Sequence, residues 1–241
     1  MKLILLFLLM NLTLLMQAQS VMIDTKKYVA HFNGINVQDS AVIELPVIVG
    51  GVSNDIQHRL DPYLSPDSLL GDNIDSVIAN YKEWRSGIIG ARYRVLYNKD
   101  NVLSISVAVE TLGAYPDVFY TDVNLNLAEG KRIKATDFLI KSKMKDLAAD
   151  LDKIMQKRIK DKIKSGEIGE EDALQFFDGA KFTVENLEHF GFTDNGITFY
   201  YNYSIPHVLQ AISPDEDFPI SWKELEDYVR EGSIVDKIIN K

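Results

Sequence analysis

The chain has 241 residues, 46% of them hydrophobic, so it can bury a core without metal or disulfide cross-links, in one large or two small domains. Its formal net charge of -9 repels phosphate backbones and anionic lipid, which argues against nucleic-acid binding and peripheral membrane attachment. Cysteine is absent, which excludes thiol catalysis, cysteine-ligated zinc, disulfides and a lipoprotein anchor.

The first residues have the pattern of a secretory leader. Lys2 gives a positive start, Leu3 to Met16 form an apolar run, and Ala18 supplies a small residue before a cleavage site. This run is shorter than the roughly 20 residues that span a bilayer. The sequence therefore predicts a signal peptide at residues 1–18 and an exported protein, periplasmic or secreted, with no stable membrane span after leader removal. An uncleaved anchor is the alternative.

Two strands and two helices are expected next. Residues 27–32 and 41–49 have the composition of strands, and Pro46, which cannot donate to a ladder, places the second at an edge or a bulge. Ser53 stands where the N-cap of a helix belongs, and residues 73–84 predict a further helix. The apolar stripe of that helix is Ile74, Val77, Ile78, Tyr81 and Trp84.

The stretch from Ala91 to Lys134 alternates with a period of two through three runs and predicts an antiparallel meander with one buried face. The apolar face is Tyr93, Val95 and Tyr97, then Leu103, Ile105, Val107 and Val109, then Phe119, Thr121, Val123, Leu125 and Leu127. The opposite, wet face is Arg92, Arg94, Ser104, Ser106, Glu110, Asp122, Asn124 and Asn126. The meander predicts an α+β fold with a largely antiparallel sheet and helices on one face.

The rest of the chain alternates between helical and strand patterns. Residues 142–164 predict a long helix, and residues 170–177 a short one. Asn195-Gly196 is the strongest signal for a β-hairpin in the sequence. Ser221 and Glu224 have the spacing of a capping box, which predicts the start of the last helix. The buried stripe of the long helix is Met144, Leu147, Ala148, Leu151, Ile154, Met155 and Ile159.

No local sequence motif of a known class of enzyme is present. The chain has neither a G-x-S-x-G elbow nor a phosphate-binding glycine loop, and none of His31, His58, His189 and His207 lies three to five residues from another. The sequence therefore predicts no catalytic residue, no metal site and no cofactor.

Tyr200, Tyr201 and Tyr203 follow each other on one expected strand, with Tyr200 facing opposite to the other two. Two interpretations are open. In the first, the tyrosines on one face of the strand are exposed and contact a ligand. In the second, the tyrosines on one face belong to the core and those on the other pack under residues 206–212.

Five short motifs occur in order along the middle of the chain: Leu103-Ser104, Gly113-Ala114-Tyr115-Pro116, Asn124-Leu125-Asn126-Leu127, Gly130-Lys131 and Asp137-Phe138-Leu139. In these motifs the sequence resembles the PdaC/RsiV-like extracytoplasmic proteins. The segments FTDNGITFYYNYSIP and FPISWKELEDYV are similar to the closing part of that family. The resemblance implies a PdaC-like half at 19–112 and an RsiV-like half at 113–241, which share one sheet. Tyr115 stands where the family usually has His, and the segment after Pro206 departs from the family pattern.

The resemblance implies a non-catalytic exported module that binds or senses cell-envelope material, either a lysozyme-type protein or peptidoglycan itself. Its candidate ligand-binding residues are Tyr115, Tyr201, Tyr203 and His207. Lysozymes are often basic, so an acidic surface complements them. Two alternatives remain: a small envelope hydrolase with a dispersed site, and a structural or assembly factor that acts through a sheet edge.

Overall fold

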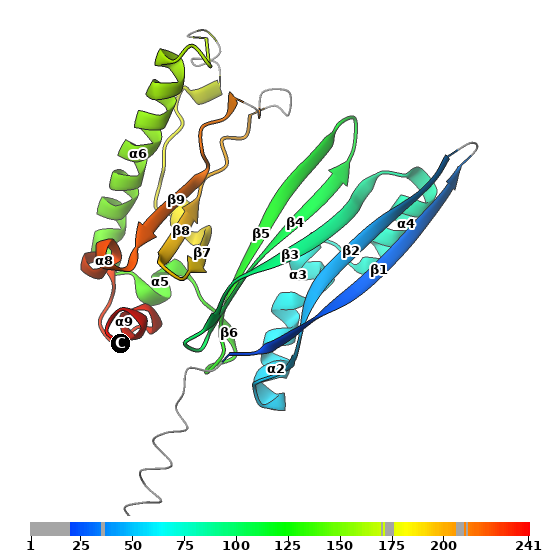
Figure 1. The fold of residues 1–241 in the computed structure, drawn as a ribbon, viewed down its shortest axis with the longest axis horizontal. Coiled ribbons are helices and arrows are strands. Elements are labelled where there is room, and N and C mark those ends of the chain that lie inside the picture. The colour runs from blue at the N-terminus through cyan, green and yellow to red at the C-terminus, as the bar shows by residue number, and fades with distance from the viewer. Residues whose placement is uncertain (1–19, 35–36, 170, 172–175, 206–209, 211) are drawn as a thin grey trace, which may run out of the picture. The chain divides into compact units, whose positions relative to one another are not determined.

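A computed structural model describes residues 20–34, 37–169, 171, 176–205, 210 and 212–241 of the chain. The chain divides into two compact units. Unit 1 comprises the chain up to Leu112 together with Val118–Arg132, and unit 2 comprises Gly113–Asp117 and Ile133–Lys241. The structure is a mixture of helices and mostly antiparallel sheet (Figure 1), which confirms the predicted α+β class.

Unit 1 is built on a sheet of six strands in the order β1-β2-β3-β4-β5-β6. The strands are β1 (Met22–Gly34), β2 (Val37–Gly50), β3 (Gly87–Lys99), β4 (Val102–Leu112), β5 (Pro116–Asn126) and β6 (Lys131–Arg132). β1 pairs with β2, and β3 with β4, in antiparallel fashion, but β2 and β3 run parallel. A parallel pair requires a crossover, and the helices between β2 and β3 supply it.

The crossover contains α2 (Asn54–Leu60), the 3-10 helix η1 (Asp61–Leu64), α3 (Pro66–Leu70) and α4 (Ile74–Trp84). Ser53 caps α2 by accepting a hydrogen bond from the backbone N–H of Ile56, as predicted. α2, α3 and α4 lie on one face of the sheet (Figure 1). The core of unit 1 forms between these helices and the sheet. Strand β4 contributes Leu103, Ile105, Val107 and Val109 to this core, each with 0% exposure.

Two strands depart from the expected alternation. A β-bulge between Val95 and Tyr97 places Tyr97 opposite Ser104 and so on the other face from Val95, which pairs with Ile105. Tyr97 is buried on that face, while Val95 is 43% exposed. Part of the expected wet face is buried as well. Ser104 and Asn124 are both buried, and the Ser104 hydroxyl donates a hydrogen bond to Asn124 Oδ1 at 2.7 Å. Asn126 is buried as well, and its Oδ1 accepts hydrogen bonds from the backbone N–H groups that follow it.

Pro46 lies in a part of β2 that has, in the described part of the chain, one partner strand. β2 pairs with β1 along its length, but with β3 only at Val42 and Ile43. The missing N–H of Pro46 therefore costs no bond to β3, which agrees with the predicted edge-like position.

Unit 2 contains a sheet of three strands in the order β7-β8-β9, formed by β7 (Phe190–Thr193), β8 (Gly196–Tyr200) and β9 (Asp217–Ser221). Its helical elements are α5 (Ala135–Phe138), η2 (Lys141–Lys143), α6 (Met144–Lys164), η3 (Glu185–Glu188), α8 (Trp222–Leu225), η5 (Glu226–Tyr228) and α9 (Ile234–Ile239). The expected single shared sheet is therefore replaced by two, because β5 continues the meander of unit 1 while β7 to β9 pair among themselves.

The long helix α6 buries the predicted stripe except for Ile154, which is 40% exposed. Trp84, at the end of α4, is likewise 67% exposed instead of buried. Both residues lie at the margin of a stripe, where small differences in helix rotation decide burial. The expected helix at 170–177 lies largely outside the described residues.

The hairpin signal at Asn195-Gly196 is shifted by one residue. Thr193 pairs with Gly196, so the loop is Asp194-Asn195 and Gly196 belongs to β8. The capping box of Ser221 and Glu224 is confirmed, but it opens the single turn of α8, and α9 is the last helix. Within the described ranges, no helix is both long and apolar enough to cross a membrane.

Candidate functional site

The hairpin of β4 and β5 presents Tyr115 at its turn. The backbone N–H of Gly113 donates to the carbonyl oxygen of Tyr115 at 3.3 Å, which closes the turn. The side chain of Tyr115 is 69% exposed. The Gly-Ala-Tyr-Pro motif thus holds an aromatic ring in solvent on a two-stranded support.

Further large side chains of the same hairpin are exposed just after the turn. Val118 is 45%, Phe119 40% and Tyr120 63% exposed. Because side chains alternate along a strand, Phe119 and Tyr120 point to opposite faces of β5. We call Tyr115, Val118, Phe119 and Tyr120 the hairpin tip.

The hairpin is acidic as well as aromatic. From Val102 to Gly130 the sequence has no lysine or arginine, whereas it has the acids Glu110, Asp117, Asp122 and Glu129. A contact surface with aromatic rings and only acidic charges complements a cationic partner better than an anionic one.

Tyr201 and Tyr203, which follow β8, lie against each other with their ring centroids 4.9 Å apart. The ring of Phe177 packs edge-on against Tyr203 at 5.5 Å, and Phe182 contacts both Tyr201 and Phe218. These five rings form an aromatic cluster in unit 2. Tyr203 is only 7% exposed, so core packing, one of the two interpretations of the tyrosine strand, describes this residue.

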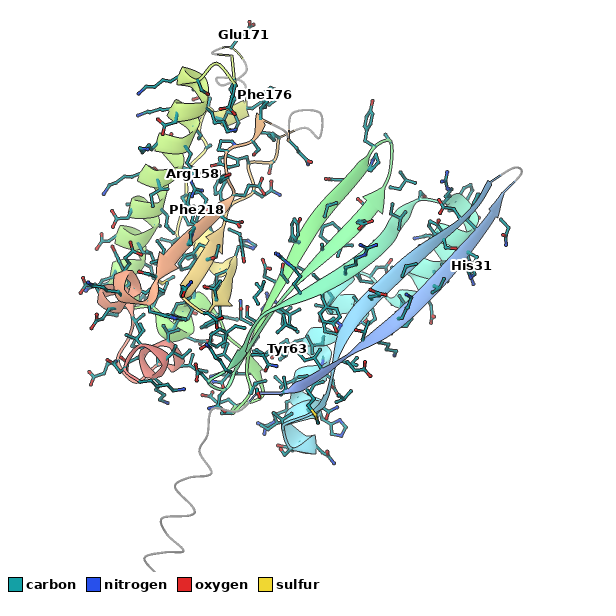
Figure 2. The ribbon with its side chains drawn as sticks, viewed as in Figure 1. His31, Tyr63, Arg158, Glu171, Phe176 and Phe218 are labelled. Carbon is teal, nitrogen blue, oxygen red and sulfur yellow. The ribbon has the colours of Figure 1, made fainter. Side chains whose placement is uncertain are left out.

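The guanidinium group of Arg158 packs against the aromatic cluster. The guanidinium carbon of Arg158, on α6, lies 4.4 Å from the ring centroid of Phe218, on β9, and Figure 2 shows the two side chains close together. Nη1 of Arg158 donates to the carbonyl oxygens of Asp215 and Asp217, each at 2.8 Å. Arg158 therefore ties α6 to the beginning of β9 with both charge and stacking.

Burial also perturbs the titratable groups of the cluster. Burial raises the pKa of the Tyr203 hydroxyl, and among the described residues this buried oxygen has no hydrogen-bond partner. Partial desolvation raises the pKa of Glu216, while a hydrogen bond from the backbone N–H of Tyr203 opposes that shift. These shifts belong to a packed region, in which charge is disfavoured on both groups.

His207 lies outside the described residues. The three other histidines are exposed, each on a different element: His31 on β1, His58 on α2, and His189 after η3. Nδ1 of His31 bonds to the Ser40 hydroxyl at 2.8 Å. In the part of the chain that the structure describes, no group of three His, Asp or Glu side chains is arranged to hold a metal ion.

The structure thus brings Tyr201 and Tyr203 together and leaves Tyr115 on the hairpin tip. Sequence reasoning missed Tyr120, because the alternation of β5 assigned only Phe119 and its face to the core. The run Val118-Phe119-Tyr120 was the available signal, since three consecutive large apolar side chains cannot all lie on one buried face.

For the sheet-edge alternative, β1 is a candidate strand: it is 13 residues long and, among the described residues, it pairs only with β2. Lys26 and Lys27 lie near its middle, and lysines on an edge strand oppose pairing with another chain.

A comparison with models of known protein families gives no match, and a comparison with curated proteins gives none either. Solved structures do match. The chain is similar to a crystal structure of a DUF3298 family member from Bacteroides fragilis, with a TM-score of 0.63 and 17% identity over 93% of this chain and 100% of that one. It is also similar to a DUF3298 family protein from Pseudomonas aeruginosa, with a TM-score of 0.61 and 13% identity over 88% and 95%. These likenesses establish that the chain has the fold of the DUF3298 structures.

Proposed function

We propose that the chain is an exported, non-catalytic binding module of the bacterial cell envelope that engages a basic, lysozyme-type protein through its hairpin tip. The observation that carries the proposal is the exposure of Tyr115 and Tyr120 on a hairpin whose charges are all acidic. The likeness to DUF3298 structures, a PdaC/RsiV-like extracytoplasmic domain type, supports the same class of function.

Tyrosine suits this role physically. Its ring offers a large contact area at a low cost in conformational entropy, and its hydroxyl bonds to polar groups at the rim of an interface. The paired strands of the hairpin limit the freedom of the backbone before binding, so little further ordering is required. The net charge of -9 attracts a cationic protein over a longer range and accelerates encounter.

Binding of a purified basic lysozyme to the protein without its leader tests the proposal. We expect association that weakens as salt concentration rises, because screening reduces the attraction between opposite charges. Tyr115→Ala and Tyr120→Ala should each weaken binding about tenfold, the effect of a moderate hot spot. Trp84→Ala is the matched control, since Trp84 is as exposed as Tyr120 but lies on α4. Absence of binding at low salt overturns this partner.

Peptidoglycan is the alternative ligand, because tyrosine rings also stack on sugars. Sedimentation with insoluble peptidoglycan distinguishes the two. Retention that depends on Tyr115 and resists high salt assigns the hairpin tip to the polysaccharide instead of a protein. The export part of the proposal is tested separately, by determining the N-terminal residue of the protein recovered outside the cytoplasm, which is expected to be Gln19.

A further inference from the structure

A cavity of about 380 Å³ lies within unit 1, between the β1–β2 hairpin and the helices that follow it. Its volume falls within the range of about 300 to 1,000 Å³ typical of small-molecule sites. It is lined by residues of β1, β2, α2, η1 and α3. None of these residues belongs to the hairpin tip or the aromatic cluster, so the cavity is independent of the function proposed above.

The apolar wall of the cavity is part of the fixed core. Leu45 and Ile48 are each 2% exposed and Leu64 is 6% exposed, so their positions are set by the packing of the sheet against the helices. The wall thus offers a preformed apolar surface to a ligand.

Two of the polar lining groups serve the fold. Gln57 Nε2 donates to the carbonyl oxygen of Ile48 at 2.8 Å, which fixes α2 against β2. Ser65 Oγ donates to the carbonyl oxygen of Pro62 at 2.9 Å, and it caps α3 by accepting a hydrogen bond from the backbone N–H of Ser68. These bonds limit the freedom of both side chains.

The two charged lining residues, Lys26 and Asp61, have different partners. Nζ of Lys26 lies 5.2 Å from the ring centroid of Tyr28, and Nδ1 of His58 lies 3.9 Å from Oδ2 of Asp61. Within the described residues, Lys26 and Asp61 form no ion pair with each other, although both line the same cavity. The adjacent lysine differs, because Lys27 Nζ is paired with Glu44 at 2.9 Å.

We propose that this cavity is a binding site for a zwitterionic small molecule, an α-amino acid or dipeptide with an apolar side chain. The carboxylate of the ligand pairs with the ammonium group of Lys26, and its own ammonium group pairs with Asp61. The apolar side chain lies against Leu45, Ile48 and Leu64. A ligand that carries both charges can pair with both groups, whereas a ligand with one charge pairs with only one of them.

Titration calorimetry with leucyl-leucine tests the site directly. Binding is expected for the dipeptide and is expected to be lost for its N-acetylated amide, which has the same apolar body without either charge. Lys26→Ala and Asp61→Asn should each weaken binding about tenfold. Lys27→Ala and Asp55→Asn are matched controls, since both residues have ion-pair partners of their own and neither lines the cavity.

Three results would overturn the proposal: no heat of binding with the dipeptide, equal affinity for the blocked derivative, or equal losses from the Lys26 and Lys27 variants. Amide chemical shifts of the wild-type protein provide a readout that needs no variant. On addition of leucyl-leucine they are expected to move at Tyr28, Gln57 and Ser65, and shifts confined to other segments would also contradict the site.

Discussion

The hydroxyl of Tyr228 donates a hydrogen bond to Oδ2 of Asp150 at 2.7 Å and so joins the C-terminal segment of unit 2 to α6. The two residues are 78 positions apart in the sequence. Next to them, Leu139 forms an isolated antiparallel bridge with Val229, and the backbone N–H of Ile140 donates to the carbonyl oxygen of Tyr228. Side-chain and backbone bonds therefore hold the last segment at the same place.

Removing this hydroxyl should destabilise the protein modestly. Tyr228→Phe keeps the ring and loses one hydrogen bond to a partly solvated carboxylate, so we expect a loss of about 1 kcal/mol in the free energy of unfolding. Urea denaturation measures it. Tyr115→Phe is the control, because that side chain is exposed and its hydroxyl should contribute nothing to stability.

The same bond predicts a dependence on alkaline pH. The hydrogen bond to Asp150, followed by burial, raises the pKa of Tyr228 to about 12. A raised pKa means that the folded state holds the proton more tightly than the unfolded chain, whose tyrosines titrate at about 10. The stabilisation is therefore complete below pH of about 10 and is lost as pH rises toward 12.

We thus expect the difference in unfolding free energy between the wild type and Tyr228→Phe to be constant near neutral pH and to shrink above pH of about 10. Denaturation curves at a series of pH values measure this difference. A difference that stays constant across that interval would show that the Asp150 bond does not perturb the tyrosine.

Much of the fold could be predicted from side-chain periodicity. In β4 the predicted core residues Leu103, Ile105, Val107 and Val109 are all fully buried, as their spacing of two indicated, although Ser104 on the other face is buried too. The caps at Ser53 and Ser221 were equally readable, because an N-cap bond is made between residues three positions apart.

The errors have a common physical origin, in that they depend on contacts between distant segments. The bulge between Val95 and Tyr97 is a property of strand pairing, and the separation into two sheets depends on which strands meet. The same contrast between local features and long-range contacts holds for the candidate sites. Tyr115 could be identified from its turn motif, and the run Val118-Phe119-Tyr120 carried a signal for Tyr120. The cavity beside Lys26 could not be predicted, since its residues come from segments that only the fold brings together.

The long helix α6 offers a test of the corrected apolar stripe. Leu151 is 0% exposed, so Leu151→Ala removes buried methyl groups and leaves a cavity, at an expected cost of about 2 to 5 kcal/mol. Ile154 is 40% exposed, so Ile154→Ala on the same helix should cost less than about 1 kcal/mol. Thermal unfolding of both variants measures the contrast, and equal losses would mean that Ile154 is buried as the sequence pattern first indicated.

Gly196 allows β8 and β9 to approach each other closely. A Cβ atom at this position would lie 1.9 Å from the carbonyl oxygen of Ile220 on β9, a contact that backbone movement alone can relieve. Gly196→Ala should therefore disrupt the pairing of β8 with β9 and destabilise the protein by about 3 kcal/mol. Gly113→Ala is the matched control, because a Cβ there meets nothing within 4 Å. Chemical denaturation compares the two variants, and equal stability would mean that β9 does not pass Gly196 at this distance.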